Sequence, residues 1–223
     1  MSDPRKERIA PPGAGFPKWV PVAGNARVAG MSWVRLAKVA YPGQFYPSLK
    51  SRLTPSSEKF PCVYLAPNAE TAVAELFGDE MSLAKARGRK IYAINAAKAD
   101  ELAFLSCPSL PRLQLCDLTE ADTRLALGLE AGSLYTSDLS IPQAWADMIA
   151  WHPNKYDGII YRSRHTDEIC LVLWTRARGR GLDKRVAFKP AGAFRNSAAA
   201  FEVARKIGIK LSFPGATLPS AAP

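Results

Sequence analysis

Four polar side chains in this sequence supply the groups that a dinucleotide-cleaving site needs. Arg52, Tyr64 and Glu75 lie within residues 51–77, and Ser163 follows much later in YDGIIYRSRH. A guanidinium binds a pyrophosphate through its planar fork, and an aromatic face stacks on a planar ring. One carboxylate beside a ribose can orient the sugar and stabilise the positive charge that develops on it.

This set of groups fits cleavage of the nicotinamide–ribose bond better than ordinary glycoside hydrolysis. Nicotinamide in a pyridine dinucleotide is already a cationic pyridinium, so it leaves as a neutral molecule without a general acid. An ordinary glycosidase needs a second carboxyl group to protonate the leaving oxygen. A single carboxylate, a fixed cation, an aromatic ring and a hydroxyl are therefore sufficient, and the four residues supply one of each.

Each of the four residues also has an ordinary structural interpretation. A lone glutamate on an amphipathic helix, such as Glu75, is usually solvated or ion-paired. Tyr64 between two apolar residues fits a half-buried strand, and Ser163 fits a turn after a strand. Arg52 fits an ordinary surface position. The functional interpretation therefore depends on the four residues occurring together.

The elements that must position these residues can be predicted from the pattern. Residues 33–39 and 63–66 are expected to form strands on either side of an irregular, proline-containing loop. Asn68 is a suitable N-cap for the helix that carries Glu75, and Gly78 is expected to end that helix. Residues 158–161 and 169–175 are the clearest strands, because they are short and rich in β-branched and aromatic residues.

Further strands are predicted at residues 90–96 and 113–118, and three more helices follow. One runs from Thr119 to Gly128, one opens on a capping box of Ser140 and Gln143, and one covers residues 197–207. Strands and helices alternate irregularly, without the repeated βαβ units of a doubly wound sheet. The fold class indicated is therefore α+β.

The charge of the chain is concentrated at its two ends. The net charge of the 223 residues is +10, of which residues 1–30 carry +3 and residues 176–223 carry +8. A nucleic-acid-binding core would carry the positive charge itself, so direct nucleic-acid binding is not expected. A non-enzymatic protein whose basic ends bind an acidic partner stays open. The predicted organisation is an irregular basic arm at 1–30, a domain at 31–176, and a basic extension at 177–223 packed on the core.

Several other kinds of site are not indicated. The four cysteines lack CxxC spacing and are expected to be reduced core thiols of a cytoplasmic protein. His152 and His165 have no partners at metal-ligand spacing, so no metal site is predicted. The sequence has neither a GxxxxGKS loop nor a GxGxxG turn after a strand. No apolar stretch approaches the roughly 20 residues of a membrane helix, and no membrane association is expected.

Six segments of the chain resemble the RES-domain family, which is named after an Arg, a Glu and a Ser. They are WVRLAKV, SRLTPSS, CVYLAPNAETAVAELF, LCDLTEADTRLALGL, IPQAWADMIAW and YDGIIYRSRHTDEICLVLW, and they span about residues 31–176. The order and spacing of Arg52, Tyr64 and Glu75 match the family pattern. The resemblance implies a fold similar to ADP-ribosyltransferase toxins, with a split β-sheet core and flanking helices around an NAD cleft.

The resemblance also implies a role for each residue. Glu75 would be the catalytic carboxylate, assisted by Arg52 on the NAD phosphates. Tyr64 would pack on the nicotinamide, and Ser163 would be a polar contact near the phosphates. Arg35 corresponds to the first-strand arginine of the family and would be a second phosphate ligand. Relatives often have an aromatic residue beside that arginine, whereas its neighbours here are valine and leucine.

The activity implied is that of a toxin from a toxin–antitoxin pair that consumes NAD as its substrate, without a cofactor. Hydrolysis is one route, and phosphorolysis with inorganic phosphate as co-substrate is another. ADP-ribosylation of a protein target is the alternative. The partner implied is an Xre-type antitoxin, and a homodimer stays open.

Overall fold

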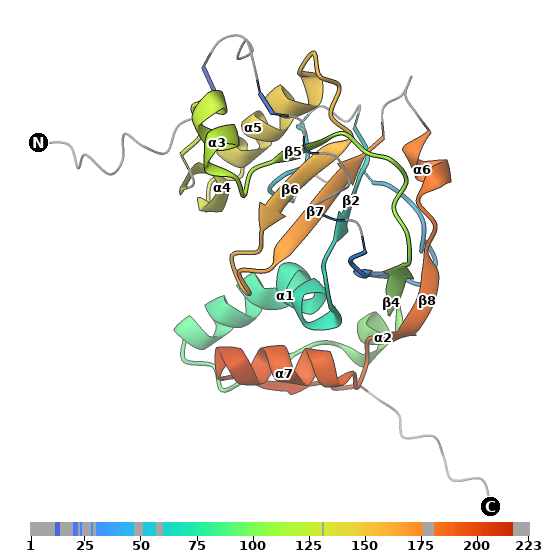
Figure 1. The fold of residues 1–223 in the computed structure, drawn as a ribbon. Helices are drawn as coiled ribbons and strands as arrows, with labels where there is room; N and C mark the ends of the chain where they lie inside the picture. Colours follow the sequence, from blue (N-terminus) through green and yellow to red (C-terminus); the bar gives the residue numbers. More distant parts are fainter. Residues whose placement is uncertain are drawn as a thin grey trace, which may run out of the picture. The chain divides into compact units, whose positions relative to one another are not determined.

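The computed structural model describes residues 12–13, 20–21, 23, 28, 30–46, 51–56, 60–130, 132–175 and 181–215. The chain forms two units, each assembled from segments that are separated in the sequence. The first unit takes residues 1–31, 43–65 and 109–187, and the second takes residues 32–42, 66–108 and 188–223. Figure 1 shows the helices and strands of both units.

A four-stranded sheet forms the centre of the first unit. Its strands are β2 (Cys62–Leu65), β5 (Leu115–Asp117), β6 (Gly158–Arg162) and β7 (Ile169–Trp174), in the order β2-β7-β6-β5. β7 is antiparallel to both of its neighbours, whereas β5 and β6 are parallel. The inner strands β6 and β7 are buried over most of their length, which explains their nearly continuous apolar sequence.

Four helices belong to the first unit: α3 (Ala121–Leu127), α4 (Gly132–Tyr135), α5 (Ser140–Trp151) and α6 (Leu182–Arg185). α5 buries Trp145, Ala146 and Ile149, and α4 packs beside it (Figure 1). α3 ends at Gly128, whose left-handed φ of 69° is suited to glycine, as predicted.

The second unit contains a three-stranded sheet, a two-stranded pair and three helices. The sheet has β4 (Leu102–Cys107) between β1 (Trp33–Lys38) and β8 (Lys189–Ala193), with antiparallel pairing throughout. β3 (Ile91–Ala93) pairs in parallel with β9 (Lys210–Ser212). The helices are α1 (Ala69–Ala86), α2 (Ala96–Asp100) and α7 (Ala198–Ile207).

Aromatic packing between distant segments closes the core of the second unit. The ring of Phe194 stacks on Phe77 of α1 with a centroid distance of 5.2 Å and also contacts Phe104 of β4. α7 lies against α1 (Figure 1), with Val203 and Ala204 buried in the same cluster. Residues 194–213 therefore contribute Phe194, α7 and the segment around β9 to this core, and their removal would expose its apolar side chains.

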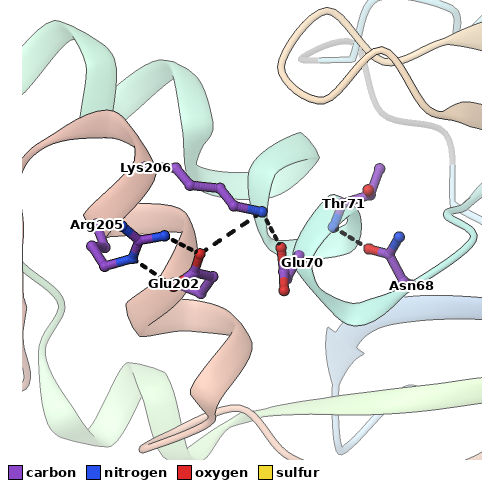
Figure 2. Close-up of polar contacts among 6 residues, drawn as sticks. All are labelled: Asn68, Glu70, Thr71, Glu202, Arg205 and Lys206. Atoms are coloured by element: carbon purple, nitrogen blue, oxygen red, sulfur yellow. Dashed lines mark hydrogen bonds and ion pairs between the residues drawn. The ribbon is translucent and has the colours of Figure 1, made fainter.

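The first turn of α1 is fixed by a cap and by an ion pair from α7 (Figure 2). Asn68 accepts a hydrogen bond from the Thr71 N–H at 2.8 Å, as the N-cap assignment predicted. Lys206 of α7 lies 2.6 Å from Glu70 in that first turn, and an acidic residue there also suits the helix dipole. Because the ion pair is exposed, the cap contributes more of the local stability.

Helix α1 differs from the prediction at its C-terminal end. Gly78 was expected to end the helix, but it is buried within it, and the helix continues to Ala86. A glycine costs a helix interior about 1 kcal/mol relative to alanine. Burial of Met81 and Ala84 beyond Gly78 in the core of the unit more than offsets that cost.

Two predicted helix caps are not formed, and one strand was not predicted. Glu120, rather than Thr119, precedes α3, and no side-chain cap bond is made there. The hydroxyl of Ser140 donates to Asp138 instead of capping α5. β4 was not predicted because it follows directly on α2, yet it is the middle strand of its sheet. The four cysteines are buried and unbridged, as expected.

Most of the basic arm and the run at 176–180 lie outside the described residues, and the three-part domain division stays a prediction. Within the described ranges, no helix is long and apolar enough to span a membrane. In the same part of the chain, no three His, Cys, Asp or Glu side chains form a group that could hold a metal ion.

The Asn68 cap can be tested by substitution. Asn68→Ala removes the acceptor for the Thr71 N–H and should lower the free energy of unfolding by about 1 kcal/mol. Asn68→Asp is the matched control, because it keeps the acceptor and adds a favourable charge at the helix N-terminus. Urea unfolding measures both variants. A loss below about 0.5 kcal/mol for Asn68→Ala would show that the cap is not significant.

Candidate functional site

Arg52 lies in an irregular loop that side chains hold in place. Within residues 51–56 no backbone group belongs to a helix or a strand, yet Leu53 and Thr54 are 3% and 1% exposed. A buried segment of this kind needs partners for its polar groups, because unpaired backbone groups are costly to bury. The partners come from β2 and from the α4–α5 region.

Tyr64 of β2 uses its hydroxyl group to hold this loop. The hydroxyl oxygen accepts a hydrogen bond from the Leu53 N–H at 3.0 Å and lies 3.1 Å from the Thr54 hydroxyl oxygen. The half-buried ring meets Tyr161 of β6 edge-to-face, with a centroid distance of 6.3 Å. The hydroxyl of Tyr64 therefore orders the loop, whereas its ring makes packing contacts.

The guanidinium of Arg52 is oriented by a backbone carbonyl. Its Nη1 donates a hydrogen bond to the carbonyl oxygen of Thr136, the residue that follows α4. The side chain is half-buried. Because a guanidinium is a rigid planar fork, a bond at one nitrogen fixes the direction of the other N–H groups as well.

Ser163 lies directly after β6, where it stabilises the turn to β7. Its hydroxyl oxygen is within hydrogen-bond distance of the N–H groups of His165 (3.2 Å) and Thr166 (3.3 Å), and accepts from both. The residue is 2% exposed. These contacts match a serine in a turn, and a contact between Ser163 and phosphates stays a prediction.

Arg35 of β1 lies on the sheet of the second unit, opposite Leu105 of β4. Its guanidinium carbon is 5.7 Å from the centroid of the Phe188 ring, which is a cation–π distance. Val34 and Leu36 pack against the core cluster that contains Phe104. Because side chains alternate along a strand, Arg35 lies on the opposite face of β1 from that core.

Glu75 is half-buried on the side of α1 that faces away from the core cluster. Val73 and Phe77 mark the core side of the helix. Glu75 shares its face of the helix with residues three or four positions away. These neighbours are Thr71, Ala72 and Gly78, and all three are buried. The carboxylate therefore has small neighbours on both sides along the helix.

The structure connects two of the predicted site residues through the backbone of the loop. Arg52 and Tyr64 belong to one hydrogen-bonded network, because the Tyr64 hydroxyl binds the residue after Arg52. Ser163 belongs to the same unit, whereas Arg35 and Glu75 belong to the second unit. Convergence of all five residues on one substrate stays a prediction.

Sequence reasoning missed the residues that support Arg52. Thr54, Thr136 and Gln143 all contact the loop or its arginine. Gln143 was assigned to a capping box, but its side-chain amide donates to the carbonyl oxygen of Ser51 at 3.1 Å. The available signal was that Gln143 is a polar residue among apolar ones in an amphipathic helix. That signal did not indicate which residue Gln143 would bond to.

Comparison with known proteins assigns the family. The family model of the RES domain matches residues 26–196, which is most of the chain. The chain belongs to the RES-domain family. A search of the curated proteins found no match.

One solved structure supports the fold of this RES-domain chain. It is a chain from the crystal structure of the M. tuberculosis MbcT–MbcA toxin–antitoxin complex, with a TM-score of 0.50 and 21% sequence identity. The similarity covers 80% of this chain and 88% of the other. The prediction of an α+β, ADP-ribosyltransferase-like fold is confirmed.

The role of the Tyr64 hydroxyl can be measured as stability. Tyr64→Phe leaves the buried Leu53 N–H without its acceptor, so unfolding should cost about 1–3 kcal/mol less. Tyr135→Phe is a matched control, because the exposed Tyr135 hydroxyl makes a longer bond of 3.3 Å to the Arg162 carbonyl. Its effect should stay within about 0.5 kcal/mol. Equal effects of the two substitutions in denaturant unfolding would contradict this role.

Proposed function

We propose that this RES-domain protein is the toxin of a toxin–antitoxin pair and consumes NAD by breaking its nicotinamide N-glycosidic bond. The observation that carries the proposal is the family match over residues 26–196, which includes Arg35, Arg52, Tyr64, Glu75 and Ser163. The fixed guanidinium of Arg52 and the half-buried carboxylate of Glu75 support it, because both are groups that the reaction needs.

The proposed reaction is a substitution at C1′ of the nicotinamide ribose. The bond from C1′ to the pyridinium nitrogen breaks, and its electron pair stays on nitrogen, so nicotinamide leaves neutral. A water oxygen forms the new bond to C1′ and loses a proton to solvent, which gives ADP-ribose. With inorganic phosphate as the nucleophile, the product is a phosphate ester of ADP-ribose. The Glu75 carboxylate stabilises the positive charge on the ribose as the old bond breaks.

The other residues bind the substrate in this proposal. Arg52 and Arg35 bind the pyrophosphate, for which a planar fork is better suited than a lysine. Tyr64 packs its ring on the nicotinamide, since its hydroxyl is already engaged with the loop. Ser163 contributes a hydroxyl near the phosphates. No cofactor is needed, because NAD itself carries the good leaving group.

A protein that destroys NAD requires a partner that neutralises it in the cell that makes it. The similar solved chain comes from a toxin–antitoxin complex, which supports such a partner here. We propose an Xre-type antitoxin, and the proposal places the toxin in the cytoplasm, where NAD is abundant. A homodimer is compatible with this arrangement.

The ADP-ribosyltransferase-like fold favours one further candidate, in which a protein side chain replaces water as the acceptor. NAD labelled in its adenylate half separates the two reactions. Label that remains on a protein band indicates transfer, whereas soluble ADP-ribose or its phosphate ester indicates depletion. Both reactions release nicotinamide and depend on Glu75.

Substitution of the carboxylate tests the proposed function. Glu75→Gln should lower NAD turnover by about 100-fold or more, because it removes the charge that stabilises the ribose cation. Asp79→Asn is the control, since it changes an exposed acid one turn further along α1. Nicotinamide release by purified protein is the measurement, with thermal unfolding to verify the fold. The proposal fails if the wild-type chain releases no nicotinamide, or if Glu75→Gln protein releases it at the wild-type rate.

A further inference from the structure

We propose that Gln143 and Asp147 are positioning residues that fix the Arg52 loop for substrate binding. Both belong to α5, one helical turn apart, so they lie on one face of that helix. We call this pair the α5 clamp. The inference rests on the proposed function, because it assigns the clamp to the phosphate-binding arginine of that same site.

The α5 clamp holds the loop at both ends. The Gln143 side-chain amide donates to the carbonyl oxygen of Ser51 at 3.1 Å, immediately before Arg52. The Asp147 carboxylate accepts from the Ser56 N–H at 3.0 Å and also from the Ser56 hydroxyl. Between these ends, Tyr64 holds Leu53 and Thr54. Each residue from 51 to 54, and residue 56, therefore has a hydrogen-bond partner elsewhere in the unit.

The placement of Gln143 is not explained by core packing. The residue is 9% exposed and lies between the buried residues Pro142 and Trp145 on α5. Burial of an amide is unfavourable unless it is hydrogen-bonded, so an apolar residue of similar size would suit the core better. The hydrogen bond to the Ser51 carbonyl satisfies the buried amide, and Ser51 immediately precedes Arg52.

Loss of the clamp should act on binding rather than on bond breaking. A displacement of about 1 Å at a positioning group is enough to lower catalytic efficiency substantially. Arg52 would contact the phosphates both before and during the reaction, because they do not change charge as the glycosidic bond breaks. An interaction of that kind affects KM and leaves kcat nearly unchanged.

The test uses the full chain and four substitutions on α5. Gln143→Met keeps the volume and removes the donor, so KM for NAD should rise about tenfold, the equivalent of one buried hydrogen bond. Asp147→Ala should change KM in the same direction. Asp147→Asn keeps an oxygen acceptor for Ser56 and should restore most of the affinity. Ser140→Ala is the control, because that hydroxyl donates to Asp138, which lies outside the Arg52 loop.

A double-mutant cycle separates positioning from general stability. In an Arg52→Ala background, Gln143→Met should raise KM no further, because its effect passes through the arginine. Additive effects, or a Gln143→Met variant with wild-type KM, would overturn the inference. If Gln143→Met protein fails to fold, the KM values of Asp147→Ala and Asp147→Asn are compared instead. Equal KM values for these two variants would overturn the inference.

A failure of the proposed function can be distinguished from a failure of the α5 clamp. If the wild-type chain does not cleave NAD, the α5 clamp is judged on the loop itself. Trypsin cleavage at Arg52–Leu53 and amide exchange at Leu53 should then both be faster in Gln143→Met than in Ser140→Ala protein. Equal rates in the two variants would overturn the clamp independently of any activity.

Discussion

A buried, irregular backbone segment must be ordered by side chains, and this constraint shapes the first unit. Residues 51–56 have no strand or helix to satisfy their polar groups. Tyr64, Gln143 and Asp147 supply the missing hydrogen bonds from β2 and α5, and Thr136 supplies the acceptor for the arginine. The sheet and α5 can therefore be understood as the rigid frame on which a loop of little intrinsic order is built.

The second unit carries the Glu75 carboxylate on helix α1. One face of α1 is anchored in an aromatic core, and on the other face Glu75 has the small residues Ala72 and Gly78 beside it and the exposed Asp79 one turn further along. Gly78 illustrates the balance between these faces. It weakens the helix locally, yet it adds no side chain next to the carboxylate, and the core contacts beyond it keep the helix intact.

The sequence predicted local structure well where a single signal was sufficient. Asn68 as a cap, Gly128 as a helix end, and the buried strands β6 and β7 follow from patterns within a few residues. The errors arose where distant residues decide the outcome. Gly78 stays helical because Met81 and Ala84 beyond it pack into a core that includes Phe194, more than 100 residues away in the chain. Gln143 bonds to Ser51 instead of capping its own helix.

The candidate site shows the same division between residue type and residue role. Residue type together with the resemblance to the RES-domain pattern singled out Arg52, Tyr64 and Glu75. The role of each atom required the fold. The Tyr64 hydroxyl is used inside the protein, so recognition of a ring must depend on the face of the phenol. The Ser163 oxygen accepts from two backbone amides, so any contact with a phosphate must use its O–H as donor. In the proposed site, Tyr64 would therefore stack on a base and Ser163 would donate to an anion. The nicotinamide mononucleotide half of NAD carries both groups, the nicotinamide at one end and a phosphate at the other.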